Sequence, residues 1–320
     1  MGSLVRDPFA PPTSMRDAYG QALVALGAQR EDIVVLSADV QNSDRSGMFE
    51  AAYPERFVNV GIAEQALVDV AVGLSKAGKV PVANTFAFLF ASRALEQVRT
   101  HLAYGQANVK LAGAYAGLSD SFDGPTHHAI TDLAILRSLP NLTVVVPADS
   151  LAVERLLPQV AAWEGPVYMR LCRNEVPQVF TDAYRPEIGK GVVLREGTDV
   201  TLITCGVMLA RSLQAAEVLA AEGVDARVVE MHTIKPLDEA LVLRCAEETG
   251  GLITVEEHSI VGGLGGAVAE CLAETAAAPL VRLGLRDRFA ETGPYDALLD
   301  KYGLGVADVV AAAQRLRARR

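Results

Sequence analysis

The sequence predicts an α/β protein with two doubly wound domains, each built on a mainly parallel sheet. Short apolar runs rich in β-branched residues alternate with helical stretches along the 320 residues, as expected for parallel strands joined by right-handed helical crossovers. The runs are apolar throughout, which indicates strands covered by helices on both faces. Two prolines and two glycines interrupt the alternation within residues 176–192. We therefore expect a domain boundary there, between residues 1–185 and residues 190–320.

In the first domain, apolar runs and helical stretches follow one another in chain order. Leu95, Val98 and Leu102 form one stripe of a predicted helix, and Asp149 or Ser150 is placed to cap another. The expected strands are residues 33–36, 80–84, 108–112, 143–146 and 166–170, and the expected helices are residues 15–26, 63–77, 91–104 and 151–163.

The second domain repeats the same alternation. The glycine-rich segment Gly262-Gly263-Leu264-Gly265-Gly266 precedes one of its helices. Its spacing is not the Gly-x-Gly-x-x-Gly of a dinucleotide site, so we expect a tight turn into a helix. The expected strands are residues 200–204, 226–230, 252–256 and 281–284, and the expected helices are residues 209–222, 237–249, 265–276 and 306–317.

The bulk composition argues against several classes of protein. Lys and Arg number 29 against 39 Asp and Glu, a net charge of −10, so we do not expect a nucleic-acid-binding protein, which needs clustered basic residues. No apolar run reaches about 18 residues, and the first residues lack the apolar core of a signal peptide. We therefore expect no membrane span, a cytoplasmic location and reduced thiols at the four cysteines, which form no CxxC pair. They are Cys172, Cys205, Cys245 and Cys271.

Glu64 is the first candidate functional residue. A strand is expected to end at Gly61 and a helix to begin near Ala63, so Glu64 lies in the first helical turn beside a strand's carboxyl end. Sites of α/β proteins lie at such ends. An acidic residue in a first turn also stabilises the helix dipole, which is the purely structural alternative.

Three phenylalanines, Phe86, Phe88 and Phe90, alternate along a stretch that we expect to be extended. A strand would direct them to one face. They would then form either an apolar wall for a heteroaromatic ring or part of the core.

A polar loop is expected at residues 113–128, which hold three Gly, two Asp and two His. Such loops within compact domains are usually functional. The adjacent His127 and His128 do not have the spacing of metal ligands, so we expect polar contact with substrate and no metal site on this chain. Arginines follow the next strand, at Arg170 and Arg173, where a guanidinium can bind a phosphate or form a surface ion pair.

In this order and at these separations, the segments resemble the transketolase family, over residues 13–320. The resemblance implies a pyrimidine-binding domain for thiamine diphosphate followed by a transketolase C-terminal domain. It implies that Glu64 contacts N1′ of the aminopyrimidine and is catalytic, with Phe90 as the best match for the stacking ring. Phe86 and Asp39 are implied to line the same cofactor pocket.

The resemblance also implies a substrate channel. The Asp-Gly-Pro-Thr-His motif matches without a gap and makes His127 a second catalytic residue. Three positions that face substrate in the family differ here, at Tyr115, Phe122 and His128, which indicates either a specialised substrate or neutral divergence. The implied substrate-binding residues are Arg16, Ser43, Tyr115, Asp123 and Arg173.

The family's diphosphate-binding motif, Gly-Asp-Gly, does not occur in the sequence. The chain therefore resembles the second subunit of a split transketolase, active only with an N-terminal partner subunit that binds the diphosphate through Mg²⁺ or Ca²⁺. An α2β2 heterotetramer is implied. The implied reaction moves a two-carbon ketol unit from a ketose, expected to carry a phosphate, to an aldose.

Two rival hypotheses stay open beside this one. The first is the β subunit of a thiamine-dependent 2-oxo acid dehydrogenase or acyloin-forming enzyme, which the intact Asp-Gly-Pro-Thr-His loop and the arginines disfavour. The second is a non-catalytic regulatory paralogue, which the joint presence of Glu64 and His127 disfavours. For catalysis, Glu64 must share a proton with the aminopyrimidine, so we expect a buried carboxyl with a raised pKa.

Overall fold

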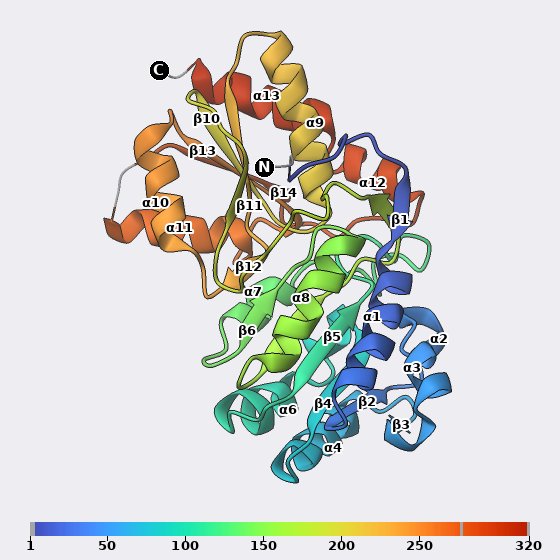
Figure 1. Ribbon diagram of the computed structural model, residues 1–320. Coiled ribbons are helices and arrows are strands. Elements are labelled where there is room, and N and C mark those ends of the chain that lie inside the picture. Colours follow the sequence, from blue (N-terminus) through green and yellow to red (C-terminus); the bar gives the residue numbers. More distant parts are fainter. Residues whose placement is uncertain (1–3, 276–277, 319–320) are drawn as a thin grey trace.

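The computed structural model describes residues 4–275 and 278–318. Two mainly parallel sheets, each flanked by helices, make up the molecule (Figure 1). This confirms the predicted α/β class with two doubly wound domains. The domain boundary expected between residues 185 and 190 stays a prediction.

The first sheet has seven strands in the order β12-β6-β7-β5-β4-β2-β3, and all its pairs are parallel except β12 with β6. Strand β12 (Thr233–Lys235) comes from the second half of the chain, so this sheet ties the two halves together. The other strands are β2 (Ile33–Ser37), β3 (Phe57–Asn59), β4 (Val80–Phe86), β5 (Lys110–Ala114), β6 (Thr143–Val145) and β7 (Val167–Arg170).

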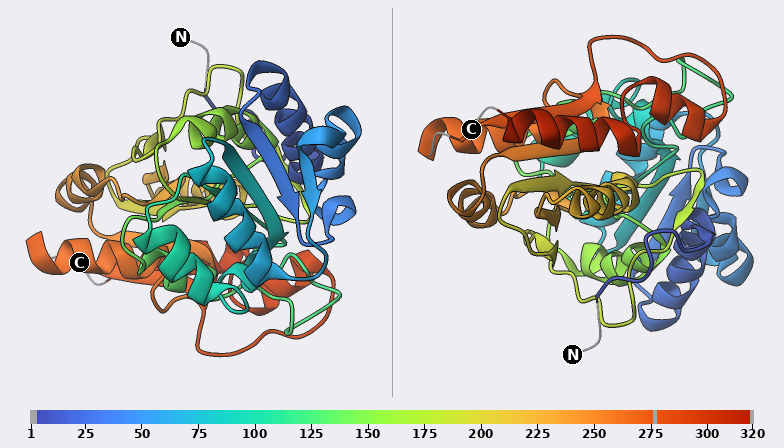
Figure 2. Two further views of the ribbon diagram at one scale, coloured as in Figure 1. Left: turned by 90° about the horizontal axis from the view of Figure 1, so that it is seen from below. Right: turned by 90° about the horizontal axis from the view of Figure 1, so that it is seen from above.

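Helices cover both faces of this sheet. The end views in Figure 2 show α1 and α8 on one face and α4 and α6 on the other. Asp149 caps α8 as predicted, because its carboxylate accepts a hydrogen bond from the Ala152 amide at 2.8 Å. The helices are α1 (Met15–Gln29), α2 (Gln41–Asp44), α3 (Gly47–Ala52), α4 (Glu64–Lys76), α5 (Ala87–Phe90), α6 (Leu95–Gln97), α7 (Asp132–Arg137) and α8 (Ser150–Ala162), with a 3₁₀ turn η1 (Pro54–Arg56).

One predicted helix and one predicted extended stretch are wrong. The helix expected at residues 91–104 begins only at Leu95, and its last seven residues form a π-helix, η2 (Val98–Tyr104). The phenylalanine stretch is extended only to Phe86, because a helical turn, α5, follows at once. Phe88 and Phe90 therefore lie on a helix rather than on one face of a strand.

The second sheet has five strands in the order β14-β13-β10-β11-β9, and only β9 runs antiparallel to its neighbour. Its strands are β9 (Val192–Arg195), β10 (Val200–Thr204), β11 (Ala226–Glu230), β13 (Leu252–Ser259) and β14 (Leu280–Leu285). Its helices are α9 (Met208–Ala221), α10 (Glu239–Glu248), α11 (Leu264–Thr275), α12 (Tyr295–Lys301) and α13 (Val306–Arg317). Strands β10 and β11 and helix α13 have the predicted bounds. The predicted helix end at Ala276 lies outside the described residues.

A small antiparallel ribbon joins the N-terminal arm to the segment after β7. It pairs β1 (Pro12–Ser14) with β8 (Glu175–Pro177). All four cysteines are free thiols, as expected. Within residues 4–275 and 278–318, no helix is long and apolar enough to cross a membrane.

Candidate active site

The predicted site residues lie at or beyond the carboxyl ends of neighbouring strands. Strands β7, β5, β4, β2 and β3 are consecutive in the first sheet, and parallel strands place their carboxyl ends along one edge. Residues that are far apart in the sequence therefore meet at this edge. At these strand ends come Arg173, Tyr115, Phe86, Asp39 and Glu64, in the order of the strands.

Tyr115 lies at the centre of the site. It follows β5 directly and has a positive φ of 62°, which is rare for a residue with a side chain. Its ring stacks on Phe86, with centroids 4.6 Å apart and planes 12° from parallel. Two guanidinium carbons lie near the same ring, that of Arg173 at 4.7 Å and that of Arg16 at 5.7 Å from its centroid. The strained backbone thus holds an aromatic ring between a phenyl ring and two cations.

Arg16 connects α1 to the short helix α2, which follows β2. Its Nη1 donates to the Ser43 carbonyl at 2.7 Å and to the Tyr115 hydroxyl at 3.4 Å. Its Nε is buried and has no hydrogen-bond partner among the described residues. Arg16, Ser43 and Tyr115, predicted from three separate segments, are therefore brought together.

Arg173 is held by two carboxylates. Its Nη1 donates to Oδ1 of Asp120 in a very short contact and to Oδ2 of Asp123 at 3.3 Å. Asp120 is fully buried, whereas the Asp123 side chain is 56% exposed. Burial, reinforced by Asp123, raises the pKa of Asp120 to about 6, and the hydrogen bond with Asp120 lowers the pKa of Asp123. Asp120 was not predicted to be a site residue. The available signal was that the polar loop contains a second acidic residue besides Asp123.

The two adjacent histidines differ in burial and in contacts. His127 is half-buried, and its ring meets those of Phe88 and Phe86 at centroid distances of 5.3 and 6.2 Å. His128 is buried, with both ring nitrogens unpartnered within the described structure, and burial lowers its pKa. His127 alone of the pair joins the site.

Glu64 begins α4 and is buried, as predicted. Its side chain is 2% exposed, and Oε2 accepts a hydrogen bond from Nη1 of Arg93 at 2.8 Å. Arg93 is 48% exposed, so it covers the carboxyl from the solvent side. Arg93 was missed from sequence, because nothing local indicates that a residue 29 positions away pairs with Glu64.

The structure corrects the expected position of Phe90. It is fully buried and packs edge-on against Tyr168, with ring centroids 6.4 Å apart. A ring inside the core cannot stack on a bound molecule, because α5 turns it away from the strand edge. Phe86 and Phe88, both half-buried, are the phenyl rings at the site. Asp39 is exposed, and its described side-chain partner is the Asn59 amide at 2.9 Å.

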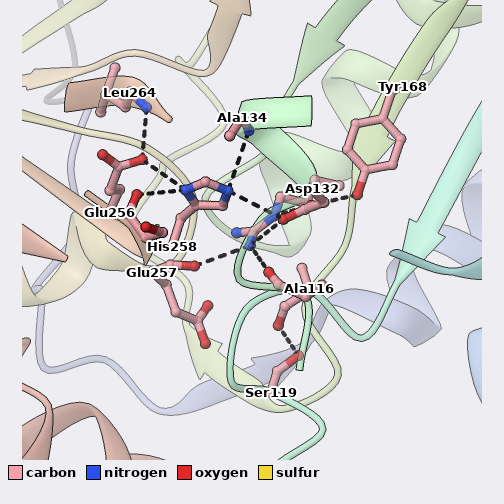
Figure 3. A network of polar contacts seen from close by, with 12 residues as sticks. Ala116, Ser119, Asp132, Ala134, Tyr168, Glu256, Glu257, His258 and Leu264 are labelled. Carbon is pink, nitrogen blue, oxygen red and sulfur yellow. Dashed lines mark hydrogen bonds and ion pairs between the residues drawn. The ribbon is translucent and has the colours of Figure 1, made fainter. Parts of the chain in front are cut away.

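A buried polar network packs against the loop (Figure 3). Arg170 donates to Asp132 at 2.7 Å and to the carbonyls of Ala129 and Glu257. It is 4% exposed, so it belongs to the core and not to an anion site. Glu257 of β13 accepts from the Leu118 amide at 2.7 Å. The second domain therefore holds the loop that carries Asp120, Asp123 and His127.

The side chain of Glu256, the neighbour of Glu257 in β13, contacts the first backbone amides of α11. It accepts hydrogen bonds from the amides of Leu264 and Gly265 at 2.7 and 2.8 Å. These are the amides that a dinucleotide phosphate would need at a helix start. The glycine-rich segment is thus a tight turn into a helix, as predicted.

The carboxyl and the phenyl rings at the site suit one half of a cofactor. A buried carboxyl can hydrogen-bond a ring nitrogen, and Phe86 and Phe88 offer apolar surface to a heteroaromatic ring. Within the described parts of the chain, no group of three or more His, Cys, Asp or Glu could hold a metal ion. These residues fit an aminopyrimidine ring.

Two family models match the chain. One described as "Transketolase, pyrimidine binding domain" matches residues 12–178, and one described as "Transketolase, C-terminal domain" matches residues 189–309. A solved structure titled "Split gene transketolase, inactive beta4 tetramer" is 49% identical, with a TM-score of 0.89 over 95% of this chain and 98% of that one. Transketolase from Campylobacter jejuni shares the fold at 21% identity, with a TM-score of 0.81 over 96% of this chain and 47% of that one.

Two curated relatives match over nearly their whole length. The 6-deoxy-6-sulfo-D-fructose transketolase subunit SqwH of Clostridium sp. (strain MSTE9) is 39% identical over 96% of this chain and 95% of its own. A subunit of the apulose-4-phosphate transketolase of Phocaeicola vulgatus is 38% identical over 90% of this chain and 93% of its own.

Proposed function

This chain belongs to the transketolase family, and we propose that it is the C-terminal subunit of a split, thiamine-diphosphate-dependent transketolase. It transfers a two-carbon ketol unit from a ketose to an aldose. The observation that carries the proposal is the buried Glu64 carboxyl at the strand edge that also bears Phe86, Tyr115 and His127. A carboxyl shielded from water there can hold a proton against a ring nitrogen.

In this proposal each residue of the chain has one task. Glu64 hydrogen-bonds N1′ of the aminopyrimidine, and Phe86 with Phe88 lines the ring's pocket. When bound, the coenzyme supplies the carbon nucleophile and the electron sink that ketol transfer requires. His127 donates to or accepts from substrate oxygens, and Asp123 orients a hydroxyl of the donor.

Arg16 and Arg173 bind an anionic group at the far end of the substrate. Both guanidinium groups lie within 6 Å of the centroid of the Tyr115 ring, which supports their assignment to one anion. The names of the two curated relatives support an anionic tail, because one specifies a sulfonated ketose and the other a phosphorylated one. Binding energy from such a remote group serves to orient the reacting carbonyl.

A partner chain completes the active site. The sequence contains no Gly-Asp-Gly segment, so we assign the diphosphate and its Mg²⁺ or Ca²⁺ to an N-terminal subunit in an α2β2 heterotetramer. The similar structure whose title reads "inactive beta4 tetramer" supports a need for that partner. The four free thiols fit a cytoplasmic protein.

The test is Glu64→Gln in the reconstituted pair, assayed for ketol transfer. We expect turnover to fall by about 100-fold or more, with folding and thiamine diphosphate binding retained. Glu31→Gln, at an exposed position, is the matched control and should leave turnover unchanged. Unimpaired turnover of Glu64→Gln would refute the role of this residue, and turnover with pyruvate in place of a ketose would favour the 2-oxo acid reaction.

A further inference from the structure

We propose that Asp120 is a specificity-determining residue, which lowers the positive charge around Arg173 so that a phosphate dianion loses most of its advantage over a substrate tail with one negative charge. The inference rests on the proposed function, because it concerns the anion-binding end of the same channel. It assigns a role to a buried acid that the catalytic scheme above does not use.

The geometry fixes Asp120 against Arg173. Asp120 has no exposed surface, and its Oδ1 accepts from Nη1 of Arg173. The backbone holds the pair from both sides, because the Arg173 amide donates to the Ser119 hydroxyl at 3.1 Å and the Gly124 amide donates to the Asp120 carbonyl at 3.0 Å. The carboxylate therefore stays beside the guanidinium when a ligand arrives.

The charges around this end of the site nearly cancel. The cations are Arg16 and Arg173, and the acids are Asp120, Asp123 and the buried Asp44, which interacts electrostatically with Arg16. His128, a buried imidazole of the same loop, has its pKa lowered by burial and stays neutral at pH 8. Since burial raises the pKa of Asp120 only to about 6, its carboxyl is mainly ionised at pH 8. Two guanidinium groups and three carboxylates then lie around this end of the site, with the half-buried His127 beside them.

An anion bound to the free nitrogens of Arg173 is attracted by the guanidinium and repelled by the carboxylates of Asp120 and Asp123. Both the attraction and the repulsion grow with the charge of the anion. Because they nearly cancel, a dianion loses most of the advantage over a monoanion that it would have in a site with two unpaired arginines. The second oxygen of Asp120 is buried and has no hydrogen-bond partner among the described residues, so the hydrogen bond from Arg173 to the first oxygen is what offsets the carboxylate's charge. A sulfonate- or carboxylate-type monoanion meets less repulsion.

The experiment is calorimetric titration of the full chain, without cofactor, at pH 8 and constant ionic strength. The probes are butane-1-sulfonate, with one charge, and propyl phosphate, with two. We expect Asp120→Asn to raise the ratio of phosphate to sulfonate affinity on the order of tenfold. Asp120→Glu keeps the charge and should leave the ratio near the wild-type value. Asp182→Asn removes an exposed carboxylate near Arg155 and should not change the ratio.

Several results would overturn the inference. One is an unchanged affinity ratio in Asp120→Asn. Another is an equal loss of affinity for both anions, which would show that Asp120 only orients Arg173. The third is that neither anion binds to any variant. Thermal unfolding checks the fold of each variant, and Asp120→Ser replaces Asp120→Asn if the latter does not fold. Because no thiamine diphosphate or partner is present, failure here is distinguishable from failure of the proposed reaction.

Discussion

At the scale of single residues, the carboxyl proposed for catalysis is already paired. Glu64 is buried and Arg93 is half-exposed, so the pair is neither a free surface bridge nor a fully buried one. Exposed partners contribute little to stability, which leaves Arg93 able to move when a ring nitrogen approaches. Yet a carboxylate left without any partner inside the protein is costly. Arg93 therefore pairs with Glu64 in the isolated chain, in the place that we propose for the ring nitrogen.

Arg93→Ala should lower the free energy of unfolding by about 1–3 kcal/mol, because it leaves the Glu64 carboxylate buried and unpaired. The same substitution in a Glu64→Gln background should cost much less. Urea unfolding of the four chains measures both values. Arg99→Ala, at a nearby exposed arginine, is the control and should change stability by less than about 0.5 kcal/mol. Equal costs in the two backgrounds would contradict the pairing.

Arg173→Ala should raise KM for donors with an anionic tail more than KM for uncharged donors. The reason is that the guanidinium contributes uniform binding to the tail and makes no contact with the reacting carbons. Steady-state kinetics of the reconstituted pair with both donor types measures the difference. If both KM values rise equally, the anion does not bind at Arg173.

At the scale of elements, short connections decide where side chains point. The helical turn α5 begins directly after β4, and this turn buries Phe90 while leaving Phe86 and Phe88 at the sheet edge. In the second domain, β11 ends in a buried acid, Glu230, which accepts a hydrogen bond from the Tyr184 hydroxyl at 2.7 Å. Tyr184 lies in the segment that joins the domains and stacks on Phe180. This strand end thus anchors the connection between the two halves.

The acid at the end of β11 should make stability depend on pH. Burial raises the pKa of Glu230 from 4.5 to about 8, so the folded state binds the proton more tightly than the unfolded state does. The resulting stabilisation is present below about pH 4.5 and is lost as the pH rises through about 8. Glu230→Gln cannot ionise, so its Tm should fall less than that of wild type between pH 5 and pH 9. Thermal scans at both pH values measure this, and parallel decreases in the two proteins would disprove it.

At the scale of the whole molecule, the second domain positions the loop of residues 113–128, which we propose contacts the substrate. Glu257 accepts from the Leu118 amide, and the Gly293 amide donates to the Ser121 carbonyl at 3.0 Å. Gly117, beside Leu118, has a φ of 60°, and a Cβ there would lie 2.3 Å from Cδ of Glu257. The loop and the second domain therefore fit together only with glycine at position 117. Figure 3 shows Glu257 beside the buried network around Asp132, which it joins through the hydrogen bond from Arg170 to its carbonyl.

Gly117→Ala should loosen this contact. It adds the cost of a positive φ, about 1–2 kcal/mol, and that of overpacking against Glu257, about 1–3 kcal/mol. Gly78→Ala is a matched control, because Gly78 also has a positive φ, 84°, but no atom lies within 4 Å of its Cβ position. Hydrogen exchange of residues 115–128 should accelerate in Gly117→Ala only. Equal hydrogen-exchange protection of residues 115–128 in both variants would argue against this contact between the loop and the second domain.

The sequence by itself determined the fold class, most strands and helices and most of the residues that gather at the strand edge. Hydrophobic periodicity is a local property, and it was sufficient for most strands and helices. The resemblance of short motifs to the transketolase family supplied Glu64, His127, Arg16 and Arg173, whose roles stay predictions. Short edge strands such as β9 and β12 escaped notice, because three or four residues hold no periodic pattern.

Only the tertiary structure decided the burial of Phe90, the pairing of Arg93 with Glu64 and the contact of Asp120 with Arg173. Each depends on two segments that lie 29 or more positions apart or on the direction of a turn between elements. The energy of such a contact is set by distance and burial in the folded chain, and neither is encoded in the spacing of residues along the sequence.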